Sequence, residues 1–114
     1  MAVVRINVTP EIKTKFTIKF AQQDKIKGQK EFAAHIVSLG LAKLDASKAP
    51  PGEEPRGIPG ANGGNRSIEF DRVKNKDLIS KLAKFKTTYV YRDQSIANRA
   101  CLYAGLNIDL QDWN

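Results

Sequence analysis

Three side chains near the start of the sequence have the chemistry to contact the edges of nucleic-acid bases. Val3, Arg5 and Asn7 occupy every second position, and the residues between them, at 4, 6 and 8, are apolar. This period of two predicts a strand with one buried and one exposed face. Arg5 suits guanine O6 and N7, Asn7 suits adenine N6 and N7, and Val3 can contact a thymine methyl group. The alternative is that Arg5 and Asn7 only solvate an exposed strand face.

A second candidate site is the start of a predicted helix, formed by Lys27, Gly28, Gln29 and Lys30. The first backbone N–H groups of a helix have no partner within the helix, so they can bind an anion. The two lysines add positive charge. A phosphate bound here would position a nucleic acid without reading its sequence. The alternative is an ordinary helix junction.

Residues for catalysis or metal binding are scarce. The sequence has one histidine, His35, and one cysteine, Cys101, and they lie in different halves of the chain. Cys101 stands among small apolar residues, which favours a buried structural thiol over a nucleophile. The glycines between 57 and 64 lack the preceding strand and following helix of a dinucleotide-binding motif. We therefore expect no enzymatic activity, no metal site and no cofactor.

Positive charge is unevenly distributed along the chain, whose formal net charge is +7. Residues 1–44 hold eight basic residues against three acidic ones, 45–65 hold two against three, and 66–114 hold nine against six. A basic domain attracts polyanions, among which nucleic acid is the default candidate. The alternative is that the lysines serve only solubility. No membrane span or signal peptide is recognisable, which predicts a cytoplasmic protein without a membrane partner.

A helix is predicted directly after the first strand. Thr9 suits the N-cap and Pro10 the first helical position. Ile12, Phe16 and Phe20 follow at a spacing of four, on one helical face. Because the apolar residues from 12 to 20 also alternate with polar ones, a hairpin turning at Pro10 is the alternative.

A second helix is predicted after Lys27-Gly28-Gln29, which should end the first one. Its apolar stripe consists of Phe32, Ile36, Val37, Gly40, Leu41 and Leu44. A glycine on this stripe has no side chain to hold a neighbouring helix away. We therefore expect Gly40 to allow close helix packing.

The same order of strand and two helices recurs, with more drift, in the second half. Ile68 and Phe70 alternate with polar residues, Asn75 can cap a helix and Ser95 can cap another. The apolar positions of these helices are Leu78, Leu82, Phe85 and Tyr89, then Ala97, Cys101, Leu102, Gly105 and Leu106. The last helix matches the first half at a constant offset of 65, the preceding helix at 66 and the strand at 64. Such a repeat predicts two units that bury each other's apolar faces.

A segment rich in proline and glycine separates the two copies. Residues 45–65 contain four of the five prolines and five of the eight glycines. This composition is typical of a linker. We therefore predict a first unit over 1–44, a linker over 45–65, and a second, divergent unit over 66–114 that packs on the first.

Residues 2–44 resemble the ribbon-helix-helix superfamily of DNA-binding proteins. The resemblance rests on Arg5-Ile6-Asn7-Val8-Thr9-Pro10-Glu11 and on Gly28-Gln29-Lys30-Glu31-Phe32. In that superfamily two strands pair antiparallel into a ribbon that enters the major groove. The resemblance implies a mainly α fold with a short two-stranded β ribbon, built here as a tandem ribbon-helix-helix pseudodimer. Val3, Arg5 and Asn7 would be the outward, base-reading residues.

The layout is also similar to that of two groups of accessory proteins. The relaxosome accessory proteins of conjugative plasmids have two ribbon-helix-helix units in one chain. The DNA phosphorothioation accessory protein DndE is similar in length, in the run from Ser38-Leu39-Gly40-Leu41 to Pro50-Pro51, and in the glycine-rich approach to Ile68-Glu69-Phe70-Asp71-Arg72. The Gly-Glu-aromatic stretch of that protein is absent, because Val73-Lys74-Asn75-Lys76 follows instead.

Together these patterns predict a non-enzymatic double-stranded DNA-binding protein, either a regulator or an accessory factor. The residues expected to bind phosphate are Lys27, Gly28, Gln29, Lys30, Lys74, Lys76, Lys84 and Lys86. The second strand would expose Glu69 and Asp71, which phosphates repel unless the carboxylates accept from cytosine N4. The second unit is therefore interpreted as a docking partner that completes the core rather than as a second reader.

Two alternatives from other classes stay open. The first is a DNA-binding subunit of a DNA-modification complex of the phosphorothioation type, which would recognise DNA shape or nicks. The second is a protein-interaction module, whose contact residues would be Tyr89, Tyr91, Tyr103 and Trp113. Self-association and binding to other proteins remain open in each case.

Overall fold

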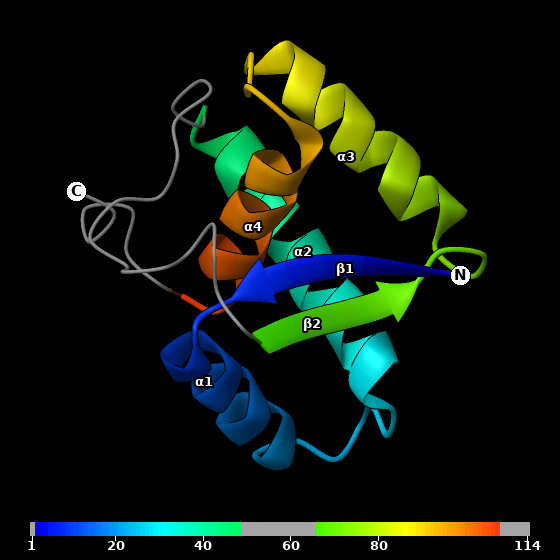
Figure 1. The fold of residues 1–114 in the computed structure, drawn as a ribbon, viewed down its shortest axis with the longest axis vertical. Coiled ribbons are helices and arrows are strands. Elements are labelled where there is room, and N and C mark those ends of the chain that lie inside the picture. Colours follow the sequence, from blue (N-terminus) through cyan, green and yellow to red (C-terminus); the bar gives the residue numbers. More distant parts are fainter. Residues whose placement is uncertain (1, 49–65, 108–114) are drawn as a thin grey trace.

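The computed structural model describes residues 2–48 and 66–107. Within them the chain forms a strand and two helices, and then again a strand and two helices (Figure 1). These are β1 (Val3–Val8), α1 (Pro10–Ala21), α2 (Gln29–Ala46), β2 (Arg66–Asp71), α3 (Lys76–Thr88) and α4 (Gln94–Gly105). The predicted mainly α fold with a short two-stranded β ribbon is confirmed.

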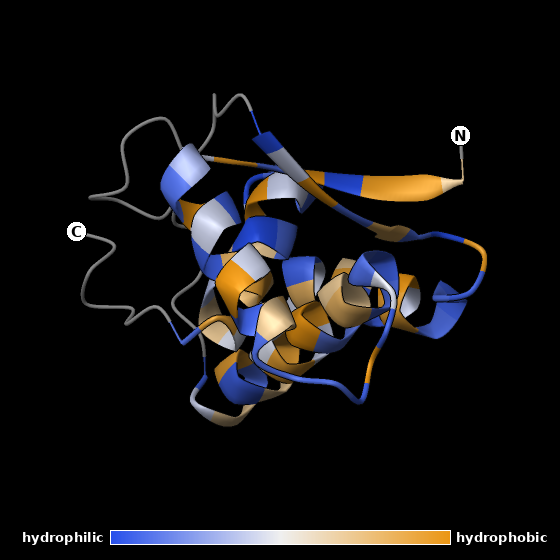
Figure 2. Cartoon of the chain, turned by 90° about the horizontal axis from the view of Figure 1, so that it is seen from below, coloured by the Kyte–Doolittle hydropathy of each residue, from blue (hydrophilic) through white to orange (hydrophobic). Residues whose placement is uncertain are grey.

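The two strands pair with each other although they are far apart in the sequence. β1 and β2 run antiparallel, from Val3 opposite Asp71 to Val8 opposite Arg66. The ribbon lies as a layer on one side of the helices, and α1 and α3 lie on opposite sides of it (Figures 1 and 2). The buried inner face of the ribbon consists of Val4, Ile6, Val8, Ile68 and Phe70.

The segment after β1 forms a helix and not a hairpin. The Thr9 hydroxyl accepts a hydrogen bond from the Ile12 backbone N–H at 3.3 Å, and Pro10 occupies the first helical position. Ile12 and Phe16 are buried, whereas Ile18, which would share their face in a strand, is 52% exposed. The cap, the proline and the spacing of four together outweigh the alternation of apolar residues.

Helices α2 and α4 cross with their backbones in close contact. A Cβ added at Gly40 would lie 1.6 Å from the carbonyl oxygen of Cys101. A Cβ added at Gly105 would lie 2.0 Å from the carbonyl oxygen of Ile36. Every residue from 96 to 105 is buried, so α4 lies in the interior of the helical layer. The predicted role of Gly40 in close packing is confirmed.

Of the two caps predicted in the second half, one is confirmed in position and the other is wrong. Asn75 is the N-cap residue of α3, but its backbone is not extended (φ −121°, ψ 37°), and its side chain donates to the carbonyl oxygen of Asp71 at 2.7 Å instead of capping the first turn. Ser95 lies within α4, and the N-cap is Asp93, whose carboxylate accepts from the Ile96 N–H at 3.0 Å. Asp93 has the extended backbone that an N-cap requires.

Two element boundaries also differ from the prediction. α1 ends at Ala21, before Lys27-Gly28-Gln29, and the Gln23 side chain bonds both the N–H and the carbonyl of Ile26 in the connecting loop. α2 continues to Ala46, so the first two residues of the predicted linker are helical. The part of that linker from 49 to 65 lies outside the described residues.

The one cysteine is buried, as predicted, and two of the tyrosines proposed for partner binding are buried with it. Burial raises the pKa of the Cys101 thiol to about 12. Tyr91 is 4% exposed and Tyr103 is fully buried, so neither presents a surface to a partner. Tyr89 is half-buried and donates its hydroxyl to Asp45 at 2.7 Å. Trp113 lies outside the described residues.

The glycine crossing predicts a large effect of one methyl group. Replacing Gly40 with alanine should destabilise the fold by about 3 kcal/mol or more, because relieving a contact with a rigid carbonyl requires the helices to separate. The gain in helix propensity, about 1 kcal/mol, is too small to compensate. Urea unfolding measures the difference. Gly28→Ala is the matched control, because its Cβ would meet Glu31 at an ordinary 3.5 Å, and it should cost about 1 kcal/mol or less. Equal stabilities of the two variants would contradict the close crossing.

Candidate nucleic-acid interface

The face of the ribbon that points away from the helices carries the predicted base-reading residues. Arg5 and Asn7 are exposed and Val3 is half-buried. On β2 the outward residues are Ser67, Glu69 and Asp71, which lie opposite Asn7, Arg5 and Val3 respectively. The two strands therefore present unlike side chains, a basic and polar set beside an acidic one.

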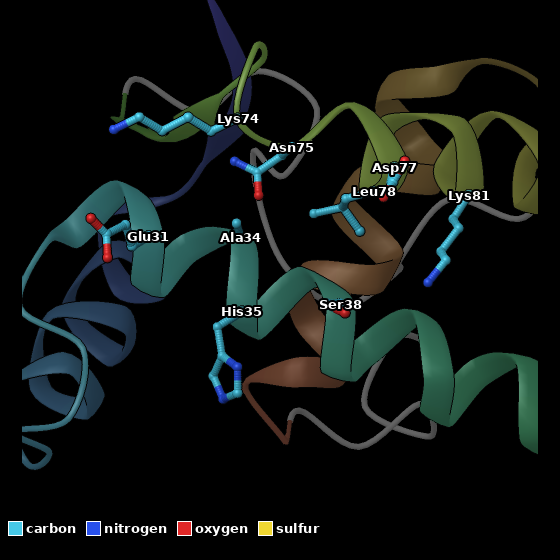
Figure 3. Close-up of a pocket in the computed structure, with 9 residues that line it drawn as sticks. All are labelled: Glu31, Ala34, His35, Ser38, Lys74, Asn75, Asp77, Leu78 and Lys81. Carbon is cyan, nitrogen blue, oxygen red and sulfur yellow. The ribbon is translucent and has the colours of Figure 1, made fainter.

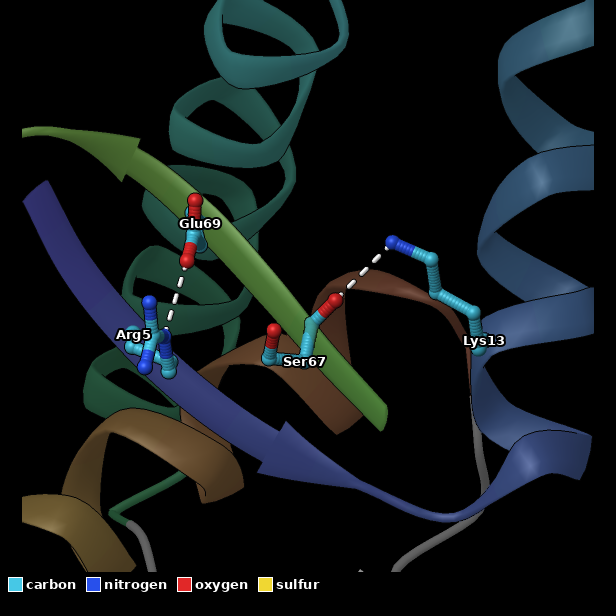
Figure 4. A network of polar contacts seen from close by, with 4 residues as sticks. All are labelled: Arg5, Lys13, Ser67 and Glu69. Carbon is cyan, nitrogen blue, oxygen red and sulfur yellow. Dashed lines mark hydrogen bonds and ion pairs between the residues drawn. The ribbon is translucent and has the colours of Figure 1, made fainter. Parts of the chain in front are cut away.

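An ion pair occupies the centre of this outward face (Figure 4). Nε of Arg5 donates to Oε2 of Glu69 at 2.8 Å, across the two strands. The Arg5 side chain is 53% exposed and that of Glu69 26% exposed. Exposed pairs of this kind contribute about 0–1 kcal/mol to stability, so the contact orients Arg5 without locking it.

A lysine on α1 ties that helix to β2 (Figure 4). Nζ of Lys13 donates to the backbone carbonyl of Ser67 at 2.9 Å, and the ammonium lies 5.7 Å from the centre of the Phe16 ring. The sequence pattern did not single out Lys13. Its partner is a main-chain atom on a strand 54 residues away, so only the folded arrangement identifies the contact.

The start of α2 lies beside β2. Gly28 is the N-cap and supplies no side-chain hydrogen bond to the first turn of α2. Gln29 and Lys30 line a pocket of about 230 Å³ together with Ser67 and Glu69 of β2. Lys27, just before the helix, is exposed.

A second pocket brings Gly28, Lys30 and Lys74 together, in a volume of about 310 Å³. Glu31 and Asp71 line the same pocket, so its two lysines face two carboxylates. The hydrogen bond from the Lys74 backbone N–H, with the charges of Lys74 and Lys30, lowers the pKa of Asp71. The carboxylate stays ionised at neutral pH and competes with a phosphate for the two lysines.

The remaining predicted phosphate ligands lie along α3 and do not join this pocket. Lys76 and Lys84 are exposed and Lys86 is half-buried. Lys74 also lines a polar groove of about 400 Å³ between α2 and α3, into which Lys81 extends from the far end (Figure 3). At 1.5 Å per residue, the helix separates Lys76 from Lys86 by about 15 Å. The lysines of the second half are thus spread along and around α3 and do not form one site.

The start of α4 differs from the start of α2. Its first turn is capped by Asp93, which also accepts the hydroxyl of Ser95 at 2.7 Å. The hydrogen bonds from Ser95 and from the Ile96 N–H lower the pKa of Asp93. A fixed carboxylate occupies the position that an anion would take, so this helix end is unsuited to phosphate.

Comparisons with protein families, curated proteins and solved structures gave no match for this chain. The described residues contain no group of three or more histidine, cysteine or acidic side chains placed to hold a metal ion. Among the helices of the described ranges, none has the length and apolar character needed to cross a bilayer. The features that bear on function are therefore the β1–β2 ribbon and the basic residues beside it.

The Asp93 cap predicts a pH-dependent loss of stability. Asp93→Ala should cost about 1 kcal/mol at pH 7, because it removes the acceptor for the first turn of α4. The pKa of Asp93 is lower in the fold than in the unfolded chain, where it is about 3.9. The stabilisation is therefore complete above that value and is lost as the pH falls through the folded pKa.

Urea unfolding of the wild type and Asp93→Ala at pH 7 and pH 3 tests this expectation. The difference in free energy of unfolding should shrink at the lower pH. Asp93→Asn is the matched control, because an amide caps at either pH and does not titrate in this range. An unchanged difference between pH 7 and pH 3 would show that ionisation of Asp93 has no part in the cap.

Proposed function

We propose that this protein binds double-stranded DNA without an enzymatic activity, as a tandem ribbon-helix-helix pseudodimer that inserts the β1–β2 ribbon into the major groove. The main observation in support of this function is the ribbon of β1 and β2. It is formed within one chain, it lies on one side of the helices, and its outward face holds Arg5 and Asn7 in exposed positions. A two-stranded ribbon fits the major groove, where its side chains reach base edges.

The strand register supports the twofold relation of the two halves. Shifting β1 by the strand offset of 64 residues maps Val3 onto Ser67, Arg5 onto Glu69 and Asn7 onto Asp71. In the ribbon Arg5 lies opposite Glu69, its own counterpart. Val3 lies opposite Asp71, the counterpart of Asn7, and Asn7 lies opposite Ser67, the counterpart of Val3. This reciprocity is what a local twofold axis through the Arg5–Glu69 pair would produce.

The helix crossing supports the same relation by independent contacts. Gly40 packs against the carbonyl of Cys101, and Gly105 packs against the carbonyl of Ile36. Gly105 lies 65 residues after Gly40, and Cys101 lies 65 residues after Ile36. Each contact is therefore the counterpart of the other, as at the interface of a symmetric dimer.

Electrostatics supports a nucleic-acid partner. The chain carries a formal charge of +7. Lys13, Lys30 and Lys74 lie around β2, near the Gly28 end of α2. Lysines beside a ribbon in the groove would lie near the flanking phosphates, where each neutralised phosphate releases a counterion and strengthens binding.

Salt titration tests DNA binding. The logarithm of the affinity for duplex DNA should fall linearly with the logarithm of salt concentration, by about 0.9 per phosphate contact. Lys30→Ala should weaken binding to all sequences alike and reduce that slope by about one unit. Arg5→Ala should lose roughly 1–3 kcal/mol on a preferred site and little elsewhere. Fluorescence anisotropy measures both effects.

Lys15→Ala, on the exposed outer face of α1, is the control for a general loss of charge.

The ribbon is complete within one chain, so one protein molecule should bind per DNA site. Affinity that is independent of salt would overturn the proposal. If Arg5→Ala and Asn7→Ala had no effect while substitution of Lys84 and Lys86 abolished binding, the contact surface would be α3 and not the ribbon.

A second candidate function is that of an accessory subunit in a DNA-modification complex. The specific observation in its favour is the pair of carboxylates, Glu69 and Asp71, on the outward face of β2. A ribbon with these residues would read few bases, so contact would fall mainly on phosphates and DNA shape.

One probe offered as intact duplex, nicked duplex and single strand separates the two candidates. A groove-reading ribbon should bind the intact and nicked duplexes about equally and the single strand weakly, because a single strand has no groove. An accessory subunit of the second kind should prefer the nicked duplex. Preference for the nick, together with indifference to the duplex sequence, would favour the second candidate.

A further inference from the structure

We propose that Arg5 and Glu69 act as one unit that recognises a single G·C base pair in a fixed orientation. The inference rests on the proposed DNA-binding function and adds which base pair the centre of the ribbon reads. It also adds the orientation in which the protein binds its DNA site. The preferred DNA site should be non-palindromic at its centre.

The geometry of the ion pair leaves the required atoms available. The contact uses Nε of Arg5 and Oε2 of Glu69. No hydrogen bond within the described residues occupies the two terminal nitrogens of Arg5 or the second carboxylate oxygen of Glu69. The pair therefore presents a guanidinium donor edge from β1 and a carboxylate acceptor from β2, side by side at the middle of the ribbon (Figure 4).

A G·C pair has the complementary pattern on its major-groove edge. Guanine offers two acceptors, O6 and N7, and cytosine offers the N4 amino donor. The terminal nitrogens of Arg5 would donate to guanine, and the second oxygen of Glu69 would accept from cytosine. An A·T pair places a donor, adenine N6, and a methyl group on this edge, so it cannot satisfy both side chains in the same way.

The ion pair also removes the main objection to a carboxylate in the groove. Glu69 alone would be repelled by the surrounding phosphates, but Arg5 neutralises it at 2.8 Å. Asp71 lies opposite Val3, which supplies no charge, and its lysine partners Lys30 and Lys74 line a pocket beside the ribbon. Among the outward acidic residues of β2, Glu69 is thus the one held by a cation that can itself contact a base.

The orientation of the DNA site follows from the two unlike residues, Arg5 and Glu69, that face each other at the centre of the ribbon. In a symmetric homodimer a residue on the local twofold axis faces its own copy, so two arginines would repel each other. Here an arginine faces a glutamate, and exchanging guanine with cytosine exchanges donor and acceptor. The flanking positions define the orientation, because Asn7 on β1 lies opposite Ser67 on β2 and the two are unlike.

The experiment selects duplexes from a library in which the centre is random and then measures individual affinities with the selected flanks held fixed. The wild type should prefer G·C in one orientation over C·G by about fivefold or more. The double variant Arg5→Glu with Glu69→Arg should invert that preference. Arg5→Lys, which keeps the charge and loses the planar fork, should bind duplex with a similar salt slope and a weaker central preference.

Lys15→Ala is the matched control, since Lys15 is exposed on α1, outside the ribbon, and its loss should leave the orientation preference at the central pair unchanged. Circular dichroism and thermal unfolding check that the double variant folds, which the exposure of both side chains favours. Salt-dependent duplex binding with no central preference, a palindromic centre, or no inversion by the double variant would overturn this inference while leaving the proposed function intact. Absence of any duplex binding would remove the proposed function itself.

Discussion

The crossing of α2 and α4 at two glycines is the contact on which the rest of the fold depends. Backbone meets backbone there, so the crossing has little freedom to adjust. The two helices carry the inner face of the ribbon, and the crossing therefore sets where β1 and β2 meet and which residues face outward. Side chains such as Ile36 and Leu102 can be exchanged for others of similar volume, but a glycine that touches a carbonyl has no substitute.

The two halves share the order of strand, helix and helix and differ in their polar groups. The apolar residues of the crossing correspond at a constant offset, whereas the outward residues of the strands and the starts of α2 and α4 do not. The start of α2 has an uncapped glycine and lysines, and the start of α4 has the fixed carboxylate of Asp93. Packing requires both halves to keep complementary shapes. A solvent-exposed position is under no such requirement, so charge there is free to diverge.

Periodicity carries much of the information about the elements and little about their pairing. The alternation around Ile6, the cap at Thr9 and the apolar stripe with Gly40 are local signals, and the structure has the corresponding elements. The cap of α4 was misassigned because Asp93 and Ser95 compete at the helix start, and backbone conformation decides in favour of Asp93. The ion pair of Arg5 required the register of two strands 64 residues apart. A shift of one residue in that register would have placed a different side chain opposite it.

In the proposed function, the charge balance around β2 separates two kinds of contact with DNA. The pocket at Gly28 holds two lysines against two carboxylates, so it offers a phosphate little net attraction until the carboxylates are displaced. The centre of the ribbon is also balanced, but its charges belong to groups with directional hydrogen bonds that match a base edge. A net-neutral pair of this kind contributes little to general affinity and discriminates between partners, because a wrong partner leaves both a donor and an acceptor unsatisfied. On this reasoning, general affinity in the proposed function comes from the lysines beside the ribbon, once phosphates displace the carboxylates that face them, and sequence preference comes from the middle of the ribbon.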